Sequence, residues 1–226
     1  MGKAAVFLDR DGVINENRPD YVKTWGEFVF LPGVMESLRR LAQSDLLIVV
    51  ITNQSAIGRG LVSLEEAKAI NHCMVEEIEW AGGRVDGVFM CPHRPDEGCD
   101  CRKPRPGLLR QAAEKLDVDL KRSFLVGDAL SDVEAARAAG CQPILVLTGR
   151  GREQLTQQTQ GCPVVPDLAA AVEHILRCQV QAAAPGPLSP GACPGQQPGA
   201  HTGRAASEAS RPAMRAGDAS LADTRR

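Results

Sequence analysis

Short apolar runs recur along the chain, and each one is followed by polar residues and then by an amphipathic stretch. The longer runs lie at residues 4–8, 46–52, 85–90, 124–126 and 144–147, and a shorter one lies at 164–165. Runs of this length without alternation are typical of strands that are buried on both faces of a parallel sheet. The pattern therefore predicts a set of core strands with a last edge strand at 164–165.

The stretches between the runs carry apolar residues at helical spacing. They predict helices over 34–42, 64–81, 107–116, 133–139 and 168–178. Ser63 with Glu66 and Ser131 with Glu134 have the spacing of capping boxes, and Asp167 is expected to cap the last helix. Each helix thus has a start signal or a clear apolar stripe.

Strands that alternate with helices predict an α/β protein with a doubly wound, Rossmann-like parallel sheet and helices on both faces. Neither the segment after Asp11 nor the one after Val85 is long enough to fold as a separate cap domain. We expect one domain over residues 1–178. From Gln179 the chain is rich in Ala, Pro, Gly, Ser and Arg with almost no large apolar residue, so residues 179–226 are predicted to be a disordered tail.

Composition excludes two classes of partner. A formal net charge of -2 over 226 residues gives no overall basic field that would attract nucleic acid or an anionic membrane. No apolar run approaches the ~20 residues of a membrane span, and no secretory leader precedes the first strand. We therefore expect a cytoplasmic monomer that binds a small molecule.

The first apolar run ends in a tight acidic turn that contains Asp9 and Asp11. Residues i and i+2 of an extended segment project to the same side, so both carboxylates can face one site. A polar turn without function would look similar. However, Thr52, Lys103 and Asp128 also follow predicted strands. Because the carboxyl ends of parallel strands meet at one edge of the sheet, these side chains are predicted to converge there.

This set of side chains favours phosphate chemistry. Two carboxylates in one pocket repel each other by roughly 4 kcal/mol at an effective dielectric near 20, so either a proton or a hard cation has to compensate. Oxygen ligands favour Mg²⁺, for which Asp9, Asp11 and Asp128 are the predicted ligands. In this hypothesis Asp9 is a nucleophile that forms an aspartyl-phosphate, and Asp11 is the general acid and base. Thr52 and Lys103 would hold the phosphoryl oxygens.

Cysteine and histidine residues crowd into the segment 91–101. They supply three thiolates and one imidazole, the donor set of a closed, structural Zn²⁺ site, and they are Cys91, His93, Cys99 and Cys101. A disulfide is the alternative, although Cys99 and Cys101 could hardly bridge comfortably. A zinc-stabilised loop would order the connection that leads directly into Arg102 and Lys103.

Segments that carry these residues resemble, in chain order, the motifs of the haloacid-dehalogenase-like phosphatases. They are Phe7-Leu8-Asp9-Arg10-Asp11-Gly12-Val13, Thr52-Asn53-Gln54-Ser55, Arg102-Lys103-Pro104 and Val126-Gly127-Asp128 with Asp132. The resemblance covers about residues 4–178. It implies the roles given above and adds the backbone carbonyl of Asp11 as a ligand of Mg²⁺.

More narrowly, the acidic turn, the segment 52–60 and the zinc loop with 102–107 are similar to the D,D-heptose 1,7-bisphosphate phosphatase subfamily. That similarity implies removal of the 7-phosphate during synthesis of the activated heptose of lipopolysaccharide or related surface glycans. One position departs from the subfamily pattern, because the residue after the fourth-motif aspartate is usually basic and is Ala129 here. The departure removes one expected phosphate contact.

Without a cap, the substrate pocket has to be walled by nearby loops. The expected substrate-binding residues come from three segments and are Asn17, Asp20, Tyr21, Thr52, Asn53, Gln54, Ser55, Arg102 and Lys103. Arg102, and with it Arg59, is expected to hold a second phosphate, because a guanidinium fork matches phosphate oxygens.

Two other interpretations stay open. Histidinol-phosphate phosphatases resemble the chain in the aspartate motif and the zinc loop, although the segments 52–55 and 102–107 fit the heptose subfamily better; another small phosphomonoester is a related alternative. A zinc-stabilised binding module without catalysis belongs to a different class. The presence of every core catalytic residue type argues against it.

Overall fold

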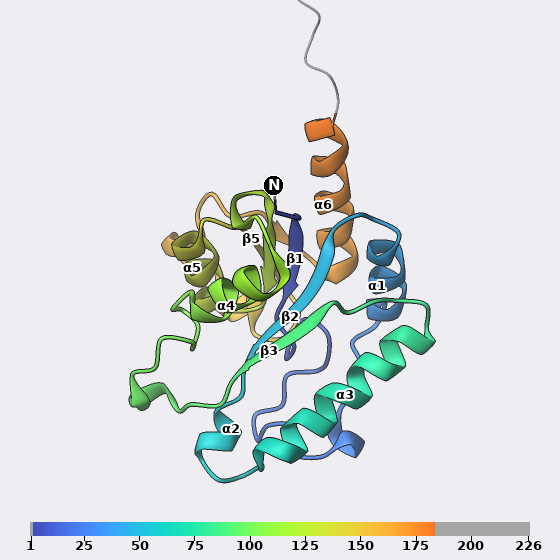
Figure 1. The fold of residues 1–226 in the computed structure, drawn as a ribbon. Coiled ribbons are helices and arrows are strands. Elements are labelled where there is room, and N and C mark those ends of the chain that lie inside the picture. The colour runs from blue at the N-terminus through green and yellow to red at the C-terminus, as the bar shows by residue number, and fades with distance from the viewer. Residues whose placement is uncertain (1, 184–226) are drawn as a thin grey trace, which may run out of the picture. The chain divides into compact units, whose positions relative to one another are not determined.

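The computed structural model describes residues 2–183, which contain a six-stranded sheet with the order β3-β2-β1-β4-β5-β6 (Figure 1). The strands are β1 (Ala5–Leu8), β2 (Leu47–Asn53), β3 (Gly87–Cys91), β4 (Phe124–Gly127), β5 (Gln142–Val146) and β6 (Val164–Val165). Every neighbouring pair is parallel. The predicted doubly wound sheet, including its edge strand at 164–165, is confirmed.

Helices cover both faces of this sheet. α1 (Val34–Ala42), α3 (Leu64–Trp80) and α6 (Leu168–Ala183) share one apolar core with it, and α4 (Gly107–Leu116) and α5 (Leu130–Ala139) share the other. Successive strand residues point to opposite faces, so Val6 and Leu8 belong to the first core while Ala5 and Phe7 belong to the second. The strands read as continuous apolar runs because both of their faces are buried.

Shorter helices lie in the connections. They are η1 (Trp25–Glu27), α2 (Ser55–Gly58), η2 (Pro95–Glu97), η3 (Leu120–Arg122), η4 (Gly151–Gln154) and η5 (Gln157–Thr159). The segment 15–32, predicted as a loop, thus contains one 3-10 turn, and Trp25 and Phe28 stack there with ring centroids 5.0 Å apart. Residues 2–183 fall within one compact unit, without a separate cap domain.

The strand order reverses at β1, and this reversal locates the site. From β1 the chain adds β2 and β3 on one side, and it then returns to add β4, β5 and β6 on the other. Connections that leave in opposite directions open a crevice at the carboxyl ends of the central strands. Asp9 directly follows β1, Thr52 lies near the end of β2, and Asp128 directly follows β4.

One of the two predicted capping boxes is confirmed and the other is wrong. Ser63 Oγ accepts the Glu66 N–H at 3.1 Å, and Glu66 Oε2 accepts the Ser63 N–H at 2.8 Å. α5, however, begins at Leu130 rather than Val133. Its first turn is closed by the Ala129 N–H, which donates to Asp132 Oδ2 at 3.1 Å.

The last helix starts as predicted and ends later. Asp167 Oδ1 accepts the Ala170 N–H at 2.9 Å, and α6 continues past the expected end at residue 178 to Ala183. Residues 184–226, which hold most of the predicted disordered tail, lie outside the described residues. Among the helices that the structure describes, none combines the length and the apolar character needed to cross a membrane.

Candidate active site

A cavity of about 610 Å³ lies at the carboxyl edge of the central strands. Its lining includes most of the predicted site residues, namely Asp9, Asp11, Asn17, Tyr21, Thr52, Asn53, Gln54, Ser55, Arg102 and Lys103. Asp20, Arg59 and the buried Asp128 are not part of the lining. Asp20 instead forms an exposed ion pair with Lys23 at 2.7 Å.

Asp9 is fixed at the end of β1. Its N–H donates to the Val126 carbonyl at 2.9 Å, and its Oδ1 accepts the Arg10 N–H at 2.7 Å and lies 2.9 Å from Lys103 Nζ. The contacts with the Arg10 N–H and with Lys103 Nζ are both made by Oδ1, and Oδ2 takes part in neither of them. Burial raises the pKa of Asp9 to about 7, against the opposing effect of the Lys103 charge.

Lys103 is buried between two carboxylates. Its Nζ lies 2.9 Å from Asp9 Oδ1 and 2.6 Å from Asp132 Oδ1, and it donates to the Ile51 carbonyl at 3.1 Å. Burial disfavours the ammonium, but Asp132 and Asp9 outweigh it and raise the pKa of Lys103 above its usual value. The side chain is therefore a fixed positive charge at the bottom of the pocket.

Asn53 holds the backbone of Lys103 from both sides. Its Nδ2 donates to the Lys103 carbonyl at 3.1 Å, and its Oδ1 accepts the Lys103 N–H at 3.1 Å. Asn53 was predicted as a substrate contact. Because its carboxamide already makes these two bonds, its visible role is to position Lys103.

A cluster of three carboxylates, from Asp9, Asp128 and Asp132, has one oxygen of each within 4.8 Å of the others. Asp132 belongs to this cluster although no role was predicted for it, and the Asp11 carboxylate is bonded elsewhere. Asp128 Oδ2 accepts the Arg150 N–H at 2.8 Å, whereas the buried Oδ1 has no partner among residues 2–183. Burial raises the pKa of Asp128 to about 6. A buried oxygen without a donor, beside another carboxylate, fits Mg²⁺.

Close packing keeps Asp128 in place. Gly12 has a φ of +88°, and a Cβ at this position would lie 2.2 Å from Asp128 Oδ2. Gly149 approaches from the loop after β5, where a Cβ would also lie 2.2 Å from the same oxygen. Both positions therefore require glycine, because any side chain would displace the carboxylate.

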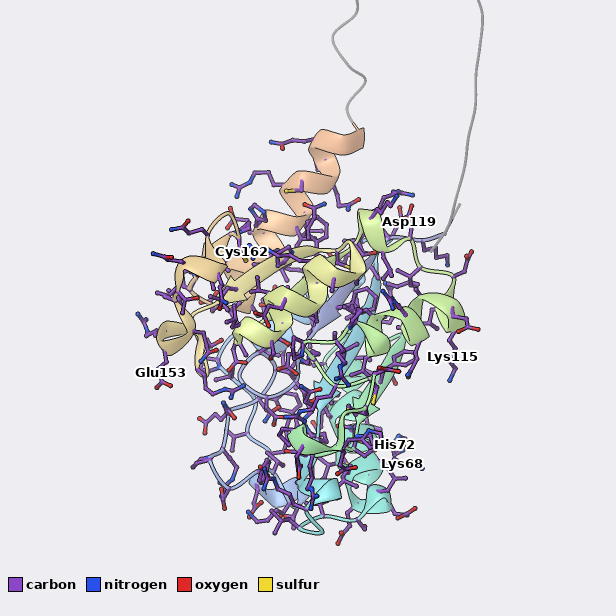
Figure 2. The ribbon with its side chains drawn as sticks, turned by 90° about the vertical axis from the view of Figure 1, so that its left-hand side faces the viewer. Lys68, His72, Lys115, Asp119, Glu153 and Cys162 are labelled. Carbon is purple, nitrogen blue, oxygen red and sulfur yellow. The ribbon has the colours of Figure 1, made fainter. Side chains whose placement is uncertain are left out.

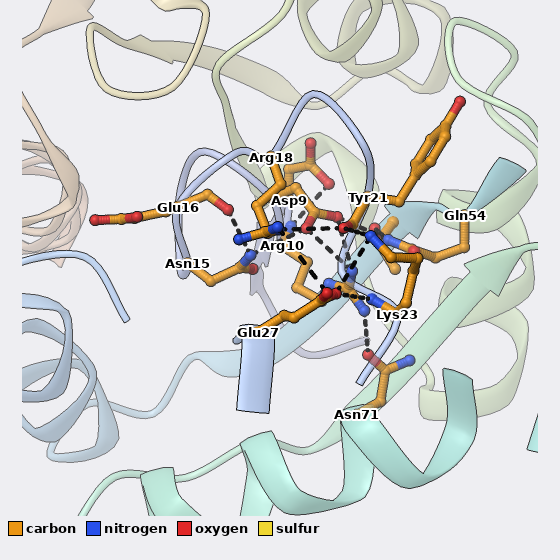
Figure 3. A network of polar contacts seen from close by, with 12 residues as sticks. Asp9, Arg10, Asn15, Glu16, Arg18, Tyr21, Lys23, Glu27, Gln54 and Asn71 are labelled. Carbon is orange, nitrogen blue, oxygen red and sulfur yellow. Dashed lines mark hydrogen bonds and ion pairs between the residues drawn. The ribbon is translucent and has the colours of Figure 1, made fainter. Parts of the chain in front are cut away.

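Asp11 bonds to Arg10, Asn15 and Gln54, and Figure 3 shows these three side chains within one network of polar contacts. Arg10 Nη2 donates to both of its oxygens at 3.0 Å, and Asn15 Nδ2 donates to Oδ1 at 3.0 Å. Gln54 Nε2 donates to Asp11 Oδ2 at 2.7 Å and to Thr52 Oγ1 at 2.8 Å, which links the acidic turn to the end of β2. Burial opposes ionisation, but the Arg10 charge and these hydrogen bonds hold the pKa of Asp11 below its usual value.

The clamp on Asp11 continues to helix α3. Arg10 is almost fully buried, and its Nη1 donates to Asn71 Oδ1 at 3.0 Å. Figure 3 shows Asn71 reaching up from α3 towards this guanidinium. Sequence reasoning missed Asn71, which lies between the apolar residues Ile70 and Met74. The one available signal was a carboxamide within an apolar helix face.

The four predicted zinc ligands come together on one side of the pocket. Cys91 Sγ and Cys101 Sγ each lie 3.6 Å from Cys99 Sγ, and His93 Nδ1 lies 3.6 Å from Cys91 Sγ and 3.3 Å from Cys101 Sγ. A tetrahedron of Zn–S bonds has edges of about 3.8 Å, whereas a disulfide is about 2.05 Å long. The cluster therefore fits Zn²⁺ and not a disulfide.

The zinc loop is tied to the pocket by its backbone. Arg102 Nη1 donates to the His93 carbonyl at 3.2 Å, and the Gln54 N–H donates to the Cys91 carbonyl at 2.8 Å. Lys103 follows directly in sequence. An ordered loop thus fixes groups on two sides of the cavity.

Residues 100–171 match the family described as HAD-hydrolase-like, the haloacid-dehalogenase (HAD) class of hydrolases, and the sheet topology and the acidic cluster agree with that match. The chain is 46% identical over 174 residues, covering 76% of this chain and 97% of the relative, to the D-glycero-beta-D-manno-heptose-1,7-bisphosphate 7-phosphatase of Bordetella bronchiseptica. It is 44% identical to the Pseudomonas aeruginosa enzyme of the same name over 78% of this chain and all of the relative.

The solved structures agree with these relatives. A crystal structure of D,D-heptose 1,7-bisphosphate phosphatase from B. bronchiseptica, complexed with magnesium and phosphate, has a TM-score of 0.74 at 45% identity and covers 77% of this chain and 98% of that one. The enzyme of that name from Burkholderia thailandensis has a TM-score of 0.60 at 36% identity, with 77% and 99% covered. The chain belongs to the heptose-bisphosphate phosphatase family of HAD-like hydrolases and is a phosphoric monoester hydrolase.

We predict that Asn71→Ala lowers kcat by roughly tenfold and leaves KM within about twofold. A freed Arg10 no longer fixes the carboxylate of Asp11, the predicted general acid and base, and general acid–base catalysis supplies about 10²–10⁴-fold in rate. Leaving the buried Arg10 donor unpaired also costs about 1–3 kcal/mol of stability. Asn71→Asp keeps the acceptor and should retain most of kcat. The measurements are steady-state phosphate release and thermal unfolding.

The matched control is His72→Ala, because His72 lies next to Asn71 on the exposed side of α3 (Figure 2) and is 73% exposed. It should change neither kcat nor the melting temperature. Wild-type kcat in a destabilised Asn71→Ala would show that Asn71 serves only the fold.

We also predict that the purified protein contains one zinc ion per chain and that Cys99→Ser loses it. Loss of zinc should lower the melting temperature and kcat/KM together, even with excess Mg²⁺, because Arg102 and Lys103 follow the loop directly. Elemental analysis and phosphate release measure the two effects. Cys73→Ser, at a cysteine of α3 outside the cluster, is the control. Full activity in zinc-free protein would contradict the prediction.

Proposed function

We propose that the protein removes the 7-phosphate of D-glycero-D-manno-heptose 1,7-bisphosphate through an aspartyl-phosphate, in the synthesis of the nucleotide-activated heptose of lipopolysaccharide or related surface glycans. The substrate assignment rests on one observation: the chain is 46% identical to a relative that is named for this reaction, over 97% of that relative's length. The reaction type is supported by Asp9 and Lys103, which line the cavity 2.9 Å apart, and by the buried Asp128 beside Asp9.

The proposed first step uses Asp9 as the nucleophile. Its Oδ2, which makes neither of the contacts made by Oδ1, attacks the phosphorus, and a new P–O bond to Asp9 forms as the bond to the sugar oxygen breaks. Asp11 donates a proton to that leaving oxygen. The product is the dephosphorylated sugar hydroxyl and a phosphorylated Asp9.

The second step regenerates the enzyme. The Asp11 carboxylate takes a proton from a water molecule, whose oxygen attacks the phosphorus and displaces the Asp9 carboxylate. Inorganic phosphate leaves, and Asp11 is again protonated for the next substrate. The hydrogen bonds from Arg10, Asn15 and Gln54 favour the ionised Asp11, the form that takes the proton from water in the second step. In the first step Asp11 is the protonated acid, and it gives up its proton to return to this hydrogen-bonded carboxylate.

Repulsion between the Asp9 carboxylate and a phosphate dianion is the main electrostatic obstacle. A like-charge contact of roughly 4 kcal/mol corresponds to about a thousandfold in rate. Lys103 reduces it from the protein side, since its Nζ lies 2.9 Å from Asp9 Oδ1. Mg²⁺, held by Asp9, Asp128 and the Asp11 carbonyl, would supply further positive charge at the phosphoryl oxygens. The Thr52 hydroxyl is the proposed donor to a third oxygen.

Loops supply the proposed sugar contacts. Asn17, Tyr21 and Ser55 line the cavity, and the Ser55 hydroxyl donates to Tyr21 Oη at 3.4 Å, which joins two of its walls. Arg102 is the proposed partner of the second phosphate. Asp20 lies outside the lining, and we propose that it contributes by holding the loop through its ion pair with Lys23.

The proposal extends to the setting of the enzyme. A thiolate zinc site favours a reducing compartment, which supports a cytoplasmic location. We propose that residues 1–178 contain the phosphatase domain and that it acts as a monomer on a small phosphorylated sugar, with no nucleic acid as partner. The net charge of -2 agrees with the last point.

The test is a substrate panel with both anomers of heptose 1,7-bisphosphate, fructose 1,6-bisphosphate and histidinol phosphate. We predict the highest kcat/KM for a heptose bisphosphate, strict dependence on Mg²⁺, and a loss of more than a thousandfold in Asp9→Asn, which lacks the nucleophilic carboxylate. Faster turnover of histidinol phosphate would overturn the substrate assignment. Full activity of Asp9→Asn would overturn the mechanism.

A further inference from the structure

Three partly accessible arginines line the cavity, and they differ in how far they are already paired. Arg18 Nε donates to the Tyr21 carbonyl at 3.3 Å, and Arg102 Nη1 donates to the His93 carbonyl at 3.2 Å. The Arg150 side chain is 55% exposed, and its one recorded side-chain contact within residues 2–183 is Nε at 3.9 Å from Asp128 Oδ2. Arg150 therefore has the most donor capacity left for a ligand.

The backbone that carries Arg150 is held firmly beside the acidic cluster. The Arg150 N–H donates to Asp128 Oδ2 at 2.8 Å, and Thr148 Oγ1 donates to the Gly12 carbonyl at 2.6 Å. Between them, Gly149 packs so closely that a Cβ would lie 2.6 Å from Gly12 Cα. The loop after β5 is thus fixed to the turn after β1, and the Arg150 guanidinium extends from a rigid base.

This wall of the pocket needs a positive charge if it is to attract a phosphate group of the substrate. Ala129 directly follows Asp128 and contributes only a buried methyl group, and Ser131 supplies a neutral hydroxyl. Glu153 also lines the cavity and would repel an anion. It lies on η4, and Figure 2 shows its side chain at the outer edge of the molecule. Arg150 is the residue on this side that can offset Glu153 and attract a phosphate.

We propose that Arg150 binds, in addition to Arg102, the phosphate of the substrate that is not removed, and that it thereby selects sugar bisphosphates over monophosphates. The inference deepens the proposed function and rests on it. A guanidinium presents parallel N–H donors that match phosphate oxygens, so the contact is strong only when the second phosphate is present. Position 129, which is usually basic in the subfamily pattern, is a neutral alanine here, and the Arg150 side chain supplies the positive charge instead.

The experiment compares Arg150→Ala, Arg150→Lys and wild type on heptose 1,7-bisphosphate and on p-nitrophenyl phosphate, which has no second anionic group. The loss of kcat/KM in Arg150→Ala should be roughly 10- to 100-fold larger for the bisphosphate than for p-nitrophenyl phosphate, and it should appear mainly in KM. Arg150→Lys should recover part of the difference, since it keeps the charge without the fork. Arg152→Ala, at an exposed arginine of η4 outside the lining, is the matched control and should show no difference.

Each result separates the inference from the proposed function. Equal losses on both substrates would show that Arg150 acts through Asp128, and no loss on either would show that it does not contact the substrate; either result overturns the inference. If wild type prefers another sugar bisphosphate, the heptose assignment fails, and the same ratio measured on that substrate still decides the role of Arg150.

Discussion

The structure places several carboxylates close together in a buried pocket. The fold is stable only because their mutual repulsion is offset by a positive charge. The carboxylates of Asp9, Asp128 and Asp132 meet within 4.8 Å, and one ammonium, Lys103, compensates two of them. Burying an unpaired charge costs several kcal/mol, so this arrangement is stable only if the lysine is held in place. The fold supplies that hold through the carboxamide of Asn53 and the carbonyl of Ile51.

The same constraint explains why the residues around the pocket are arranged in supporting pairs. Groups of the site are fixed by neighbouring residues. Arg10 and Asn71 hold Asp11, the loop after β5 holds Asp128, and the zinc loop orders the segment that leads to Lys103. A protein without a cap domain cannot exclude water by closing a lid. It instead keeps its charged groups rigid, and loops at the edge of the sheet line the cavity.

Most of the fold and the positions of the proposed reacting groups could be predicted from the sequence, because continuous apolar runs and the residues that follow them are local signals. Asp9, Thr52 and Lys103 line the cavity, as their positions after strands indicated, and Asp128 lies buried beside Asp9. Asn71 was missed because its partner, Arg10, is distant from it in sequence. The start of α5 was misplaced because Asp132 and Glu134 both suit a helix N-terminus, and only the structure shows which one bonds.

The central claim is that the phosphoryl group passes through Asp9, and chemical trapping tests it most directly. Borohydride reduces an aspartyl-phosphate to homoserine, so enzyme quenched during turnover and digested should carry homoserine at residue 9 by mass spectrometry. The account predicts this conversion at Asp9 alone, only with substrate and Mg²⁺ present. Conversion at Asp11, or an unmodified Asp9 in enzyme that is turning over, would contradict it.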